Sequence, residues 1–283
     1  MYYSATIIQM SGVYDKSTAV WLSSLTSTIN FAGTFVGLYA VERAGRRKVT
    51  LISLGAVVFA LALLGAGFQI GAGHSPSSSF FSTDPRDVDC TALSECNACI
   101  ASSVCGFCFD DSSVSGANGT CLAANTHDAA IGSITSACVD GTRAAEKIVW
   151  ASDWCPSPYS WMTLVGLCLF LLAFAPGMGP MPWTINAELY PMQSRSVCVS
   201  VATSFCWFFN MLISFTFLTL VRLLTKQGAF YLYSSMAAIG FVYLFIALPE
   251  TKGKSLEDTA LLFGDNSRRS SDSSNGTSRS KPV

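Results

Sequence analysis

Five long apolar blocks divide this sequence, and they constrain its fold more than any other feature. The blocks cover residues 17–41, 49–70, 159–181, 196–221 and 229–248. A helix needs roughly 20 apolar residues to cross the hydrocarbon core of a bilayer, and each block comes close to or exceeds that length. Only 12% of the 283 residues are charged, which is about half the fraction found in an ordinary soluble domain. The sequence therefore predicts an integral, multi-pass membrane protein built from α-helices.

Basic residues give these spans an orientation. Four of the seven residues in 42–48 ("ERAGRRK") are basic, and basic residues near the ends of spans mark the cytoplasmic side. Alternation then places 71–158 and 222–228 outside the cell and the Ser-rich tail 249–283 inside, where we expect it to be mostly disordered. The segment 1–10 is apolar but too short to span, so we interpret it as the end of a span whose beginning is missing. The net charge of −1 gives no indication of nucleic-acid binding.

The loop 71–158 holds eight of the eleven cysteines. A dense, even set of cysteines suits an oxidising, extracellular compartment, and the same loop carries a glycosylation sequon at Asn118. The two pairs of cysteines in 96–108 look superficially like a zinc site, but structural zinc pairs usually stand about 12–20 residues apart. We therefore expect disulfides and no metal, and their connectivity stays open. The candidates are Cys90, Cys96, Cys99, Cys105, Cys108, Cys121, Cys138 and Cys155.

The third apolar block ends in a stretch that disrupts helices, "FAPGMGPMPW" at 174–183. Each interior proline removes a backbone hydrogen bond and clashes with the preceding turn. A single proline would indicate an inert kink, but three prolines with two glycines favour unwound backbone, which lipid tolerates only where protein or a wet cavity covers it. Broken helices of this kind form the binding sites of secondary transporters. The residues of the predicted break are Pro176, Gly177, Gly179, Pro180 and Pro182.

Polar and aromatic side chains within the spans are candidates for binding a small polar molecule. Trp183 could anchor the chain at the membrane interface, or its ring could stack on the C–H face of a polyol. Asn30 lies in the first block, and Trp207 and Asn210 are spaced i, i+3 on one helix face of the fourth. Each amide could equally serve a hydrogen bond between helices. No Asp, Glu, Lys or His lies in the middle of a block, so any proton-coupling residue lies outside this chain.

Three motifs in order give the chain a family resemblance. They are "VERAGRRK" (41–48), "PGMGPMPWTINAELYP" (176–191) followed by Arg195, and "LPETKGKSLED" (248–258). With them the chain resembles the C-terminal half of sugar porters in the major facilitator superfamily, and most of all the proton/myo-inositol cotransporters. The cysteine-rich stretch 96–108 resembles a plexin–semaphorin–integrin repeat. The implied fold is an all-α, C-terminal six-helix bundle whose first helix is truncated, with a small disulfide-rich extracellular insert.

The resemblance divides the chain and assigns roles to residues. Residues 1–70 would hold the end of helix seven with helices eight and nine, 71–158 the insert, 159–248 helices ten to twelve, and 249–283 the tail. The aromatic pair Tyr2 and Tyr3 matches the family's outer gate. The implied substrate contacts are Asn30, Phe174, Trp183, Trp207 and Asn210. The implied cytoplasmic charge network, which would lock one state of the carrier, is Glu42, Arg43, Arg46, Arg47, Glu188 and Arg195.

The resemblance implies transport by alternating access, without covalent chemistry or a cofactor. The expected substrate is myo-inositol or a related polyol or hexose, moved with protons across the plasma membrane. The expected partners are this small substrate, protons, the lipid bilayer and the missing N-terminal half of the carrier. An alternative is a non-transporting protein whose helices anchor the cysteine-rich ectodomain while that ectodomain binds a partner.

Overall fold

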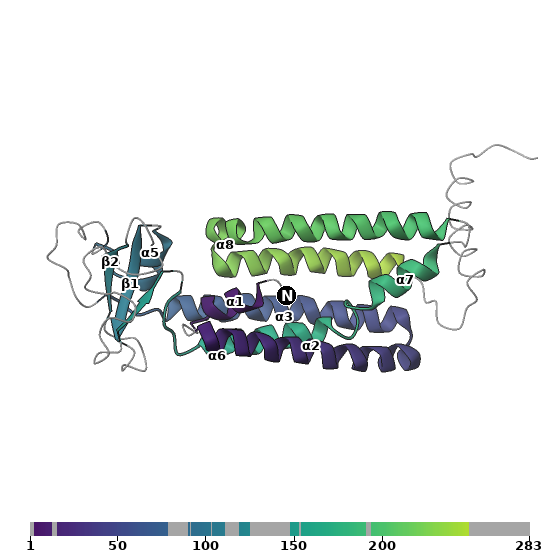
Figure 1. Ribbon diagram of the computed structural model, residues 1–283, viewed down its shortest axis with the longest axis horizontal. Helices are drawn as coiled ribbons and strands as arrows, with labels where there is room; N and C mark the ends of the chain where they lie inside the picture. The colour runs from purple at the N-terminus through teal and green to yellow at the C-terminus, as the bar shows by residue number, and fades with distance from the viewer. Residues whose placement is uncertain are drawn as a thin grey trace, which may run out of the picture.

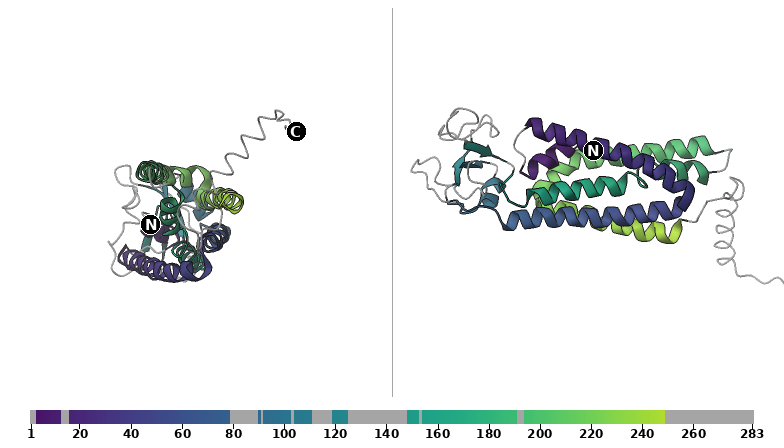
Figure 2. Two further views of the ribbon diagram at one scale, coloured as in Figure 1. Left: turned by 90° about the vertical axis from the view of Figure 1, so that its right-hand side faces the viewer. Right: turned by 90° about the horizontal axis from the view of Figure 1, so that it is seen from below.

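The computed structural model describes residues 3–12, 16–78, 90, 92–102, 104–110, 119–124, 148–152, 154–190 and 194–248. Its helices form an elongated bundle, and a small unit that contains β-strands lies at one end of that bundle (Figures 1 and 2). Some of the predicted features lie outside the described residues. These are Tyr2, Asn118, Cys138 and the tail 249–283.

Helices account for most of the described chain. Those of the bundle are α1 (Ser4–Met10), α2 (Lys16–Ala44), α3 (Arg46–Gly73), α6 (Ser160–Phe174), α7 (Met181–Leu189) and α8 (Arg195–Ala247). Within the described residues, α3 and α8 are long and apolar enough to cross a membrane, and α6 is a shorter apolar helix. Only Gly45 separates α2 from α3, and its φ of 92° lies in a region that glycine adopts without a Cβ penalty.

The element α8 consists of two antiparallel helices (Figure 1), which correspond to the fourth and fifth predicted blocks. The chain reverses at Thr225, whose φ of 69° and ψ of 166° are not helical. This reversal lies within the connection that the sequence predicts at 222–228.

Large apolar side chains from α1, α3, α6 and α8 fill the core of the bundle. Phe68 of α3 stacks on Phe230 of α8 with 5.3 Å between ring centroids, and both rings belong to a buried cluster that includes Ile8, Leu64, Leu167 and Phe217. Small residues bring α3 and α6 close together, because an ideal Cβ on Gly166 would lie only 3.2 Å from the Cα of Leu64. The α3 helix therefore packs against both α6 and α8.

The cysteine-rich insert contains a sheet, so the all-α class describes only the bundle. Strand β1 (Cys105–Asp110) lies between β2 (Gly119–Ala123) and β3 (Ile148–Ala151), and both pairings are antiparallel. The fully buried Phe107 pairs with Cys121 on one side and with Ala151 on the other. The strands have only four to six residues, and a short apolar run cannot be told from a buried helix segment by periodicity alone.

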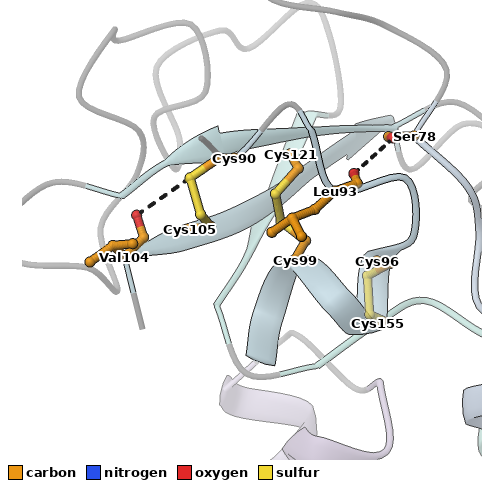
Figure 3. The surroundings of a disulfide bond; sticks show 9 residues. All are labelled: Ser78, Cys90, Leu93, Cys96, Cys99, Val104, Cys105, Cys121 and Cys155. Carbon is orange, nitrogen blue, oxygen red and sulfur yellow. Dashed lines mark hydrogen bonds between the residues drawn. A yellow bond between two sulfur atoms is a disulfide. The ribbon is translucent and has the colours of Figure 1, made fainter. Parts of the chain in front are cut away.

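Disulfides hold the insert together (Figure 3). The described bonds join Cys90 to Cys105, Cys99 to Cys121, and Cys96 to Cys155, and Cys108 is disulfide-bonded as well. The Cys96–Cys155 bond fastens α5 (Cys96–Ala101) to the segment that leads into α6. Beside it, the Asn97 side-chain amide donates a 2.7 Å hydrogen bond to the Ala72 carbonyl near the end of α3. The insert is therefore attached to the bundle at both of its ends.

Candidate functional site

A short interruption separates α6 from α7, within the segment predicted to break. The α6 helix ends at Phe174 and α7 begins at Met181, with turns between them. Two backbone hydrogen bonds span the turns, from Gly179 N–H to Phe174 O at 3.0 Å and from Met181 N–H to Gly177 O at 3.0 Å. Pro182 differs from the prediction, because it lies in the first turn of α7, where the missing N–H of proline costs no helical hydrogen bond.

The interruption is packed between α2 and α3. An ideal Cβ on Gly37 of α2 would lie 2.6 Å from the Cα of Pro176, and a Cβ on Gly177 would lie 2.9 Å from the Val49 carbonyl oxygen of α3. Such close contacts between backbones are possible only because both positions are glycines. The unwound backbone is therefore covered by protein on these two sides, as membrane depth requires.

Ser53 of α3 contacts the interruption directly, and the sequence analysis did not select it. Its hydroxyl donates a 2.6 Å hydrogen bond to the Ala173 carbonyl and accepts a 3.1 Å hydrogen bond from the Met178 N–H. The side chain is buried, with 5% of its surface exposed. Its signal in the sequence is weak, because it is one of two hydroxyl residues in the apolar block 49–70, and a helix can also satisfy a hydroxyl from its own backbone.

A cavity of about 350 Å³ lies among α1, α2, α3, α6 and α8. Two predicted site residues line it, Tyr3 and Asn210. The Tyr3 hydroxyl donates a 2.5 Å hydrogen bond to the Ser214 carbonyl, and its ring stacks on Phe217. The Asn210 amide N–H donates to the Cys206 carbonyl at 3.0 Å. The rest of the lining is mostly leucine and phenylalanine with a few hydroxyl side chains.

The other predicted substrate residues do not line this cavity, but two of them lie one helical turn from residues that do. Asn30 stands four residues after Thr26, which lines the cavity, and three before Gly33, which contacts Ala175. These spacings place all three on one face of α2. Phe174 stacks on the cavity residue Phe170 with 5.9 Å between centroids.

The predicted substrate residues also differ in how far they are buried. The Asn30 amide oxygen is buried and accepts no hydrogen bond from any described residue. Trp183 and Trp207 are half exposed, at 45% and 57% of their surfaces. Orphaned buried acceptors are uncommon in folded proteins, so among the predicted substrate residues Asn30 is the one with a buried polar atom that lacks a partner among the described residues.

The charged residues of the predicted network lie on α2, α3, α7 and α8, and α7 and both ends of α8 lie at the end of the bundle opposite the insert (Figure 1). Arg46 at the start of α3 forms a 2.6 Å ion pair with Glu188 of α7. Arg47 donates to the Phe245 carbonyl at 2.9 Å, and Arg195 donates to the Tyr190 carbonyl at 3.3 Å.

The remaining members of the predicted network lie on α2. The Arg43 guanidinium lies 4.8 Å from the centroid of the Tyr39 ring. Glu42 is exposed and forms no ion pair with any described residue.

One group of cysteines has the spacing of a metal site. The sulfur atoms of Cys90, Cys105 and Cys121 lie within 4.8 Å of one another. All three are oxidised in disulfides, and metal ligation by cysteine requires the thiolate. Among the described residues, this group therefore offers a structural core for the insert and no metal ligands.

A model of a known protein family matches most of the chain. The model of the "Sugar (and other) transporter" family matches residues 1–83 and 129–263. The gap between the two matched segments, residues 84–128, falls within the cysteine-rich insert. The human proton myo-inositol cotransporter is 45% identical to this chain over 269 residues, which cover 93% of this chain and 41% of the relative.

Further relatives come from a nematode and a plant. The proton myo-inositol cotransporter hmit-1.1 of Caenorhabditis elegans is 35% identical, over 95% of this chain and 45% of the relative. Inositol transporter 4 of Arabidopsis thaliana is 31% identical, over 93% of this chain and 45% of the relative. The chain thus spans less than half the length of these relatives.

Solved structures share the fold. A double tryptophan mutant of XylE aligns with a TM-score of 0.54 at 17% identity, over 92% of this chain and 38% of that chain. A D-xylose-proton symporter aligns with a TM-score of 0.53 at 16% identity, over 90% of this chain and 39% of that chain. The family model and the relatives confirm the predicted resemblance to sugar porters, and the solved structures share the fold. The chain belongs to the sugar (and other) transporter family.

Proposed function

We propose that this chain forms the C-terminal half of a carrier that moves myo-inositol, or a closely related polyol or hexose, across the plasma membrane by alternating access. The observation that carries the proposal is the interrupted helix between α6 and α7, which is packed between α2 and α3, while Phe170 and Leu171 of α6, within about one helical turn before the interruption, line a cavity. Broken helices near the bilayer midplane form the substrate sites of secondary transporters. The names of the relatives described above support inositol as the first substrate to test.

The proposed substrate contacts are Asn30, Phe174, Trp183, Trp207 and Asn210. The buried, unpartnered amide oxygen of Asn30 suits a ligand that donates hydroxyl hydrogen bonds. The exposed ring of Trp183 offers an apolar face for the C–H side of a cyclic polyol. Tyr3, hydrogen-bonded and stacked beside the cavity, suits the role of an outer gate. Such a site would discriminate strongly against analogues without hydroxyls, because its own polar groups would then stay unpaired.

The ion pair between Arg46 and Glu188 is proposed to lock one state of the carrier. It connects α3 to the short helix α7, which also carries Trp183. A movement of α7 during transport would break this pair, and its loss would shift the balance between two states. Protons are proposed to couple through a residue outside this chain, because no Asp, Glu, Lys or His lies in the middle of its predicted spans.

A chimera tests the proposal. In it this chain replaces the matching residues of the human proton myo-inositol cotransporter, and uptake of labelled myo-inositol is measured in cells or vesicles. We expect uptake that an inward proton gradient increases. Trp183→Ala should lower uptake by roughly tenfold, because a lost aromatic contact is worth about 1 kcal/mol or more.

Trp161→Ala is the matched control, since Trp161 is also an exposed tryptophan. It lies at the start of α6, at the opposite end of that helix from the interruption. Its uptake should equal that of the parent chimera. A chimera that reaches the membrane and takes up no inositol or hexose would overturn the proposal. The alternative, a helical anchor for a partner-binding ectodomain, predicts this loss together with retained binding by the insert.

A further inference from the structure

The interruption between α6 and α7 leaves backbone groups that cannot find their helical partners. In a continuous helix the Ala173 carbonyl would accept from the N–H of residue 177, and the Met178 N–H would donate to the carbonyl of residue 174. The turns redirect both groups, because the Phe174 carbonyl accepts from Gly179 instead. Unpaired backbone groups away from water are costly, so these two need other partners.

One side chain satisfies both groups. The Ser53 hydroxyl donates to Ala173 O at 2.6 Å and accepts from Met178 N–H at 3.1 Å. It thus replaces a helical donor on the α6 side and a helical acceptor on the α7 side. A hydroxyl is suited to this because it donates and accepts at one atom.

The small size of the Ser53 side chain is also needed for the close approach of Gly177. An ideal Cβ on Gly177 would lie 2.6 Å from the Ser53 Oγ and still closer to the Ser53 Cβ. The turn therefore passes directly over this serine, and a larger side chain would push the turn away. Alanine would preserve the contact with Gly177 but remove both hydrogen bonds.

We propose that Ser53 is a positioning residue that fixes the interrupted helix, and so sets where α7 begins. Its importance for transport rests on the proposed function, because α7 carries Trp183 and Glu188. Its effect on the backbone does not depend on that function. Ser53 does not line the cavity, so it acts through the unwound segment and not through the substrate.

Hydrogen–deuterium exchange of the purified full chain tests the backbone effect. The peptide 174–181 is informative because its two prolines contribute no amide, and Met178 is the amide that depends on Ser53. Ser53→Ala should speed exchange at Met178 by about five- to tenfold, the equivalent of one lost net hydrogen bond.

Ser234→Ala is the matched control. Ser234 is also buried, and its hydroxyl donates a 2.9 Å hydrogen bond from α8 to the Val58 carbonyl of α3. This variant loses a hydrogen bond between helices without touching the interruption, so exchange in 174–181 should stay as in the parent chain. Unchanged exchange at Met178 in Ser53→Ala, or equal acceleration in both variants, would overturn the proposal.

Uptake by the chimera tests the transport role. Ser53→Ala should lower the maximal rate by about five- to tenfold and leave the half-saturating inositol concentration within about twofold, because substrate contacts are intact. An unchanged maximal rate despite faster exchange would restrict Ser53 to a structural role and refute positioning for transport. If the parent chimera shows no uptake, the proposed function fails, and the exchange comparison still decides what Ser53 does to the backbone.

Discussion

Gly37 has the least room for a Cβ among the glycines of the described bundle. A Cβ added there would lie 2.6 Å from the Pro176 Cα and closer still to its carbonyl oxygen. These are backbone atoms, which cannot move aside as the end of a side chain can. We expect Gly37→Ala to destabilise the protein by about 1–3 kcal/mol through overpacking, even though alanine favours a helix by about 1 kcal/mol. Thermal unfolding of the purified protein in detergent measures the effect.

The control for Gly37 is another helical glycine. Gly240 in α8 has no atom within 4 Å of the position of an added Cβ, so Gly240→Ala should leave the unfolding temperature unchanged or raise it slightly. Equal unfolding temperatures for the two variants would show that α2 can retreat from Pro176 without cost. That result would contradict a close contact between α2 and the interruption.

At the scale of elements, α7 depends on a few contacts because it has only nine residues. Its ion pair with α3, Arg46–Glu188, is partly exposed, with 30% and 20% of the two side chains accessible. A pair of this kind is worth about 1 kcal/mol or less. Glu188→Gln should therefore speed hydrogen exchange within α7 by only about two- to fivefold, and the charge-swapped pair Arg46→Glu with Glu188→Arg should restore most of the protection.

Glu42→Gln is the comparison for this pair, since Glu42 is exposed at the end of α2. It should not alter exchange in α7. If Glu42→Gln accelerates α7 as much as Glu188→Gln does, general electrostatics of the charged end would explain the effect. The specific pairing of α3 with α7 would then be refuted.

The elements also differ in how well the sequence predicted them. The apolar blocks and the interruption depend on local chemistry, the length of an apolar run and the missing N–H of proline, so they can be read from neighbouring residues. The partners of the interruption cannot be read from neighbouring residues, because Ser53 and Ala173 are 120 residues apart. The sheet of the insert was not predicted, because its strands are short and cysteines make up half of the buried residues in its core. The pairing of the cysteines could not be predicted from the sequence either, because it depends on how the insert folds.

At the scale of the whole molecule, the bundle and the insert have separate cores. The core of the bundle includes Phe68 and Phe230, whereas the core of the insert includes Phe107 and Trp154, and the two clusters share no residue. The Arg46–Glu188 ion pair joins the start of α3 to α7, and α7 lies at the end of the bundle opposite the insert (Figure 1). We infer that the insert is a separate unit on a bundle that folds without it.

Replacement of the insert tests this separation. Gly71 and Ser157 are neighbours, because a Cβ on Gly71 would lie 3.7 Å from the Ser157 Oγ, so a short Gly/Ser linker can replace residues 75–156. The variant loses the Asn97–Ala72 hydrogen bond and the Cys96–Cys155 tether, but no residue of the bundle core. We expect unchanged helical circular dichroism and inositol uptake within about twofold of the parent chimera. The removed residues belong neither to the bundle core nor to the proposed substrate contacts, and changes at distant, independent sites have little effect on each other. A variant that reaches the membrane with intact helices but no uptake would mean that the insert takes part in transport.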